Sequence, residues 1–240
     1  DVREVVEGAD IVFLATPVLQ MTPMLERIVP YLKEGAIVTD AGSTKAYLWQ
    51  QIQGILPAGV HYIAGHPMTG REKSGVEAAS ADLFRHKAYV IVEDTGAPPE
   101  AHEKLMSALS HTEANFLRLD MQKHDRCASL ISHVPHVAAT ALVTLLSQSR
   151  DDMESCLKLA GGGFKDTTRI ASSNADMWAD ICMTNREAIT RHLRDLQAIL
   201  GTVIESIEEG DREAVRRYFA AGKERRDAIL DKTEKMYDLV

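Results

Sequence analysis

Short apolar segments alternate with helical patterns through the first half of the chain, and this alternation limits the possible folds more than any other feature. The first apolar segment, DIVFLATP at 10–17, is continuous and closed by Thr-Pro, as is typical of a strand buried on both faces. A helical spacing of apolar residues then runs from Met21 to Leu32, and Gly35 ends it. Further strands are predicted at 36–39, in VHYIAGHP ending at His66, at 87–94 and at 114–120.

Strands that alternate with helices predict a doubly wound parallel sheet of the α/β class. After residue 120 we find no convincing strand and at least four helical patterns. The clearest pattern, at 187–207, repeats apolar residues at four-three spacing, which indicates packing against another helix, either in the same subunit or in a dimer. The sequence therefore predicts an α/β domain at 1–120 and an all-α domain at 121–240.

Composition narrows the class of protein. A net charge of −8 over 240 residues argues against a nucleic-acid-binding surface. No apolar run comes near the roughly 18 residues of a membrane span, and the opening DVREVVEGAD does not resemble a signal peptide. The three cysteines have no CxxC spacing, which is typical of reduced thiols. We therefore expect a cytoplasmic protein that binds neither nucleic acid nor membrane.

Unusual residues follow three successive predicted strands, in ATPV at 15–18, DAGSTK at 40–45 and GHP at 65–67. Ligands of an open parallel sheet bind outside the carboxyl ends of its strands, so these loops are expected to meet at one ligand site. The residues predicted to contact a cofactor there are Thr16, Pro17, Asp40, Gly42 and Ser43.

His66 stands out because it precedes a proline inside the glycine-rich stretch GHPMTGREKSG at 65–75. Pro67 disfavours helical geometry at His66, and the glycines allow a close approach of backbone to a ligand. Taken alone, His66 could be a structural histidine, and Ser43 could cap the helix that follows it. Their convergence on one edge of the sheet favours a functional site for both.

The predicted helical domain has polar groups of its own. The stretch at 123–146 contains His124, Asp125, His133 and His136, with Pro135 interrupting a long helix. The spacing of the last two histidines permits a metal site, but no Cys or acidic pair stands at a typical zinc spacing, so no metal is expected. Arg169, in the irregular stretch at 161–187, is a candidate to bind a substrate carboxylate, although such an arginine is often solvated.

Together these motifs give a specific resemblance. The chain resembles the prephenate dehydrogenase family in ATPV, TDAGSTK, GHPMTGREKSG, HDRCASLISHVPH and GGGFKDTTRIASSNADMWADICMTNRE, which occur in family order over nearly the whole chain. The resemblance implies a Rossmann-type domain, an all-helical domain that forms a homodimer, and oxidative decarboxylation of prephenate in tyrosine biosynthesis. It also implies NAD as hydride acceptor, with NADP as an alternative.

Residue roles follow from the same resemblance. Carried over position by position, His66 matches the catalytic histidine, Ser43 the serine that assists it, and Arg169 the arginine that binds a substrate carboxylate. Further polar groups around the substrate are implied at Ser132, His136 and Glu72.

The resemblance leaves differences and alternatives. The glycine-rich turn of the first β-α-β unit is not found in this sequence, so this unit is expected to be missing from the Rossmann-type domain, and no regulatory domain is expected after the last helix. Arogenate dehydrogenase is the near alternative. A non-catalytic dimeric relative that binds an aromatic metabolite is another, and a dehydrogenase of the β-hydroxyacid type is a third.

Overall fold

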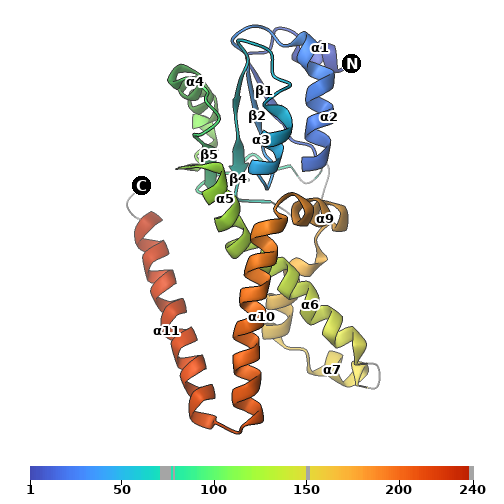
Figure 1. Ribbon diagram of the computed structural model, residues 1–240, viewed down its shortest axis with the longest axis vertical. Coiled ribbons are helices and arrows are strands. Elements are labelled where there is room, and N and C mark those ends of the chain that lie inside the picture. Colours follow the sequence, from blue (N-terminus) through green and yellow to red (C-terminus); the bar gives the residue numbers. More distant parts are fainter. Residues whose placement is uncertain (71–76, 78, 150–151, 238–240) are drawn as a thin grey trace. The chain divides into compact units, whose positions relative to one another are not determined.

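The structure is a computed structural model that describes residues 1–70, 77, 79–149 and 152–237. The chain forms two compact units, Asp1–Ile189 and Thr190–Val240 (Figure 1). The sheet-forming part contains α1 (Val2–Val6), β1 (Ile11–Leu14), α2 (Val18–Ile28), η1 (Val29–Tyr31), β2 (Ile37–Asp40), α3 (Ala46–Ile52), β3 (His61–Ile63), β4 (Gly65–Pro67), β5 (Ala88–Val92), α4 (Pro99–Leu109), η3 (Ser110–Thr112) and β6 (Asn115–Leu119). The part after residue 120 contains α5 (Met121–Ala128), η4 (Ser129–His133), α6 (Val134–Gln148), α7 (Met153–Leu159), α8 (Gly162–Thr168), η5 (Arg169–Ser172), α9 (Ala175–Thr184), α10 (Arg186–Glu208) and α11 (Arg212–Tyr237).

The strands carry helices on both faces, as predicted for a Rossmann-type domain. Neighbouring residues of one strand point to opposite faces, so Val38 packs with α2 and α3 while Ile37 packs with α4. On the first face, α2 presents Val18, Met21, Leu25 and Ile28 at helical spacing. The runs that form β2 and β5 are therefore buried on both faces as part of this core. The first run was predicted to be buried on both faces as well, and this was wrong: β1 is the last strand of its sheet and leaves Phe13 46% exposed.

The segment predicted as one third strand is divided at Ala64. Residues 61–63 pair in parallel with β2 and complete a three-stranded parallel sheet in the order β1-β2-β3. Residues 65–67 pair antiparallel with β5 in a second three-stranded sheet, β4-β5-β6, in which β5 and β6 are parallel. A Cβ on Gly65 would lie 2.8 Å from the carbonyl oxygen of Asp40, so glycine allows the chain to pass close to β2 here. This change of partner places His66 opposite Val90.

The helical part opens with a continuous stretch made of α5, η4 and α6. The turn η4 is π-helical and ends two residues before Pro135. Proline has no N–H and its ring crowds the carbonyl four residues earlier, so a widened turn at this point relieves a conflict that a regular α-helix would contain.

The same stretch corrects one prediction. Met121–Gln148 is 28 residues long, with a mean hydropathy of 1.5 in its most apolar window, of which 17% is buried. By length and composition it is able to cross a membrane, so the prediction that no segment approaches such a length was wrong. That prediction counted uninterrupted apolar residues, whereas here Ser, Thr and His interrupt the stretch without adding charge. A single helix of this kind is weak support for a membrane span, because core helices of soluble proteins pass the same criterion.

The last two helices, α10 and α11, are joined by a turn in which Gly210 has a φ of 70° and Asp211 caps α11 through the N–H groups of Glu213 and Ala214. The helix predicted at 187–207 is α10. On its apolar face, Leu200 is 49% and Ile207 60% exposed.

Candidate active site

His66 is buried at the edge between the sheet and α5. It lies on β4 with 8% of its surface exposed, and its Nδ1 is 2.7 Å from Nε2 of His124. Burial lowers the pKa of His66 well below its usual 6.5, and the Lys45 ammonium adds to this effect, as do His124 and His133. At neutral pH His66 is therefore an uncharged imidazole.

Asp125 connects this histidine pair to the loop after β2. Its Oδ1 is 2.8 Å from Nδ1 of His124, and its two oxygens accept the backbone N–H groups of Lys45 and Ala46, each at 2.9 Å. These N–H groups begin α3, where no side chain of the helix itself forms a cap. The alternative in which Ser43 caps α3 is therefore wrong, because Asp125, 80 residues away in sequence, takes that place.

A buried ion pair holds the same loop. Lys45 and Asp40 are both 0% exposed, and the Lys45 ammonium donates to the Asp40 carboxylate and, at 2.6 Å, to the carbonyl oxygen of Gly65. Asp40 also accepts the Tyr62 hydroxyl at 2.5 Å and the N–H of Gly42 at 2.7 Å. The Asp40 carboxylate therefore holds the loop next to His66, and its predicted contact with a cofactor stays a prediction.

A second group of predicted residues lies on η4, α6 and η5. Nδ1 of His136 donates to the carbonyl oxygen of Ser132 at 2.8 Å, and its ring stacks on Trp178 with centroids 3.7 Å apart. Burial lowers the pKa of His136, and the Arg169 guanidinium contributes to the shift. The structure thus brings Ser132, His136 and Arg169 together, with the Arg169 side chain exposed.

His133 joins the two groups. Its Nδ1 is 3.2 Å from Nδ2 of Asn185, which also donates to the backbone carbonyl of Asp125 at 2.8 Å, and its ring meets Trp178 edge-on. Burial lowers the pKa of His133 to about 4. His133 and His136 have different hydrogen-bond partners, and the described residues contain no group of three or more His, Cys, Asp or Glu placed to hold a metal.

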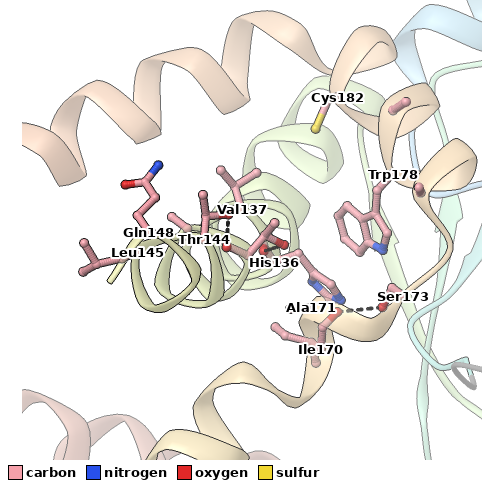
Figure 2. A pocket seen from close by; sticks show the side chains of 14 residues that line it. His136, Val137, Thr144, Leu145, Gln148, Ile170, Ala171, Ser173, Trp178 and Cys182 are labelled. Carbon is pink, nitrogen blue, oxygen red and sulfur yellow. Dashed lines mark hydrogen bonds between the residues drawn. The ribbon is translucent and has the colours of Figure 1, made fainter. Parts of the chain in front are cut away.

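A largely apolar pocket of about 640 Å³ begins at the stacked pair of His136 and Trp178. Figure 2 shows these two rings at one end and Leu145 and Gln148 of α6 at the other. Ile170, Ala171 and Ser173, which follow Arg169 in the sequence, also line this pocket.

The predicted cofactor residues lie at the carboxyl ends of β1 and β2. The hydroxyl of Thr16 is buried and has no hydrogen-bond partner among the described residues, so it fits a polar group of a ligand at this edge. A Cβ on Gly42 would lie 2.9 Å from Oδ1 of Asp40, so glycine is already required by the loop itself. Pro17 and Ser43 lie in the same loops, and Glu72 falls outside the described residues.

Sequence reasoning gave no role to several residues of this site. His124 and Asp125 stood out only as members of a polar stretch, and Lys45 only as the last residue of its loop motif. Trp178 and Asn185 lie in the irregular stretch at 161–187, where only Arg169 was singled out. The sequence offered two signals: a charged residue directly after a Ser-Thr loop, and an Asp beside a His near a helix start. Neither signal identifies the residue with which the charged side chain pairs.

These observations define a two-part protein with a Rossmann-type sheet, a helical part and a histidine-centred site between β4 and α5. Residues 1–118 match the family model described as prephenate dehydrogenase, nucleotide-binding domain, and residues 120–221 match prephenate dehydrogenase, dimerization domain. The chain belongs to the prephenate dehydrogenase family.

Individual relatives agree with this assignment. The chain is 35% identical to a prephenate dehydrogenase of Bacillus subtilis over 93% of its own length and 61% of the relative's. A crystal structure of prephenate dehydrogenase from A. aeolicus, in complex with hydroxyphenyl propionate and NAD+, matches with a TM-score of 0.83 and 30% identity over 92% of this chain and 76% of that one. A crystal structure of Synechocystis arogenate dehydrogenase matches with a TM-score of 0.80 and 27% identity, over 95% of this chain and 82% of that one. The chain spans about three fifths of the length of the curated relatives it matches.

Proposed function

We propose that the full protein oxidises prephenate to 4-hydroxyphenylpyruvate and carbon dioxide in tyrosine biosynthesis, with NAD as cofactor. The observation that carries this proposal is the buried, uncharged His66, whose Nδ1 is already engaged by His124. Among the described residues, Nε2 is therefore the ring nitrogen left for a substrate. The family assignment and the NAD+ bound to the A. aeolicus relative support it.

The proposed substrate explains why an uncharged base is needed. Prephenate carries a hydroxyl at C4 of a cyclohexadiene ring and a carboxylate at C1. As hydride leaves C4, the hydroxyl becomes a carbonyl, and loss of the C1 carboxylate then gives an aromatic ring. His66 takes the hydroxyl proton at Nε2, a contribution that is typically about 10²–10⁴-fold in rate.

The other predicted residues serve substrate binding. Arg169 is proposed to hold the pyruvyl carboxylate, since stabilising the ring carboxylate would oppose its loss. His136, Ser132 and Glu72 are proposed to surround the substrate, and Ser43 to hydrogen-bond the C4 hydroxyl or orient His66. The proximity of Arg169 to His136 supports one binding site for these groups.

The cofactor site is proposed at the carboxyl edge of β1 and β2, with Thr16, Pro17, Asp40, Gly42 and Ser43 as its residues. NAD, when bound there, supplies the hydride acceptor. The unpartnered hydroxyl of Thr16 supports this placement. Thr16 would hold one polar group of the cofactor, while the Asp40 carboxylate would keep the loop in place through Gly42 and Lys45.

Assembly and location complete the proposal. We propose a homodimer formed through residues 121–240, which belong largely to the family's dimerization domain and leave apolar side chains of α6 and α10 exposed. The division of the chain into domains at residue 120 and a cytoplasmic location are part of the same proposal, and the three unpaired cysteines support the location.

The test is an absorbance assay of nicotinamide reduction with the full-length protein. Prephenate and arogenate are each supplied with NAD and with NADP, in four parallel reactions. We expect reduction with prephenate and NAD. Reduction with arogenate alone would assign the arogenate dehydrogenase activity, which the likeness to the Synechocystis enzyme keeps as the second candidate. No reduction in any reaction would leave a protein that only binds aromatic metabolites.

A further inference from the structure

Three buried side chains form a continuous hydrogen-bonded row from α5 to β4. The Asp125 carboxylate is 2.8 Å from Nδ1 of His124, and Nε2 of His124 is 2.7 Å from Nδ1 of His66. The three residues are 5%, 1% and 8% exposed, so water does not compete for these contacts. Only the last residue of this row has a role in the proposed function.

The hydrogen bonds of Asp125 determine which ring nitrogens of this row carry protons. The two oxygens of Asp125 accept the backbone N–H groups of Lys45 and Ala46, so both oxygens act as hydrogen-bond acceptors. An ionised carboxylate only accepts, so Nδ1 of His124 must carry a proton toward it. When His124 is uncharged, its Nε2 is therefore an acceptor, and the proton between the two rings belongs to Nδ1 of His66.

We propose that Asp125 and His124 are positioning residues that hold His66 in the tautomer with Nδ1 protonated and Nε2 free to accept a proton. This inference rests on the proposed function of His66 as the base. When Nε2 takes the proton of the substrate hydroxyl, the O–H electron pair stays on oxygen to form the carbonyl. The positive charge on His66 is then shared through His124 toward Asp125.

The other charged and titratable groups around His66 that the structure describes are already paired. The Lys45 ammonium is bound to Asp40 of β2, which also accepts the Tyr62 hydroxyl of β3. His133 of η4 is turned toward Asn185. Among these groups, Asp125 is the anion that is connected to His66 by hydrogen bonds, so it is the group that can offset a charge formed on that ring.

Two substitutions of His124 separate its two contacts. In His124→Gln, the amide oxygen can replace Nε2 and accept the proton on His66, while the contact with Asp125 is lost. In His124→Asn, the amide nitrogen can replace Nδ1 and donate to Asp125, while His66 loses its acceptor. We expect kcat to fall by less than about 10-fold in the first variant and by about 10²-fold in the second, with KM changed less than about threefold in both.

The tautomer is read directly by nitrogen-15 NMR of histidine-labelled full-length protein without substrate. We expect His66 to be protonated at Nδ1 and bare at Nε2 in the native protein and in His124→Gln, and to be a mixture of tautomers in His124→Asn. His102→Gln is the matched control, because His102 is a buried histidine of α4 outside the row, and we expect native kcat and tautomer there.

A native His66 protonated at Nε2, or equal kcat in the two His124 variants, would overturn the inference. The NMR result on the native protein does not depend on variant folding or on the substrate. If it shows the expected tautomer while no substrate is oxidised, the proposed function has failed and the positioning role toward the base falls with it. If prephenate is oxidised but the tautomer is reversed, only the positioning role is wrong.

Discussion

Lys45 shows what a single buried residue contributes to this site. Its ammonium has no exposed surface, and it binds the Asp40 carboxylate and the Gly65 carbonyl next to His66. When one partner of a buried ion pair is removed, the other charge stays buried without compensation, and the protein loses much stability. Replacing both partners by apolar residues costs far less. Lys45 is therefore required once Asp40 is present.

We expect Lys45→Met to lower the free energy of unfolding by about 3–5 kcal/mol, measured by urea denaturation. Lys33→Met is the matched control, because Lys33 forms an exposed pair with Asp10 at 3.0 Å. There we expect a loss below about 1 kcal/mol. Equal losses in the two variants would show that the buried pair has no special weight.

For His66→Asn, which keeps a hydrogen-bonding side chain but removes the base, we expect kcat to fall by about 10²-fold or more with KM little changed. Steady-state kinetics with the full-length protein measures both constants. A variant that keeps more than about a tenth of the native kcat would contradict the role of His66 as base.

Arg169→Ala tests the substrate contact. Because Arg169 is proposed to bind a carboxylate that does not react, we expect KM for prephenate to rise by at least about 10-fold, as for loss of a charge-assisted bidentate contact, with a smaller change in kcat. A fall in kcat at unchanged KM would show that Arg169 acts on the reacting end of the substrate instead.

Among the elements, α6 is rich in apolar residues but buries only Ala139. Leu142, Val143 and Leu145 are 40–63% exposed, and α6 also forms one wall of the pocket in Figure 2. An apolar face of this kind gains free energy when a second surface covers it. The proposed homodimer provides such a surface.

We therefore expect Leu145→Asp to shift the protein from dimer to monomer in sedimentation-velocity experiments. Val5→Asp is the control, since Val5 is a comparably exposed apolar residue on α1, at 77%, outside the proposed dimer surface. We expect this second variant to remain dimeric. Dimers of Leu145→Asp with native stability would place the interface elsewhere.

At the scale of the whole unit Asp1–Ile189, uncharged buried histidines make stability depend on pH. The pKa of His133 is about 4 in the folded state, against 6.5 for an ordinary histidine, and the pKa of His66 is also lowered. At pH values between the folded and the unfolded pKa of such a histidine, the unfolded chain binds more protons than the folded one, so protonation favours unfolding. The stability is fully present above pH 6.5 and is lost as the pH falls toward 4.

We expect His133 alone to account for a loss of about 3 kcal/mol between pH 7 and pH 4, from a pKa difference worth 1.36 kcal/mol per unit. Urea unfolding followed by the fluorescence of Trp49 and Trp178 measures this unit directly, because both tryptophans belong to it. In His133→Gln the dependence on pH should be weaker by that amount. An unchanged slope would show that His133 is not the group responsible.

What the sequence determined by itself is the local pattern. A continuous apolar run such as AYVIV specifies a strand buried on both faces, and helical spacing specifies the buried side of α2, because periodicity follows from how a strand or helix presents side chains to a core. The loops at strand ends, with His66 among them, could be found in the same way.

Only the tertiary structure decided which side chains meet. His66 contacts His124, 58 residues away, and Asp125 caps α3 from a distance of 80 residues. The division of the third strand at Ala64 depended equally on its neighbours, since residues 61–63 found a parallel partner and residues 65–67 an antiparallel one. A periodic pattern reports which face of an element is buried, whereas the partner of a polar group depends on the path of the whole chain.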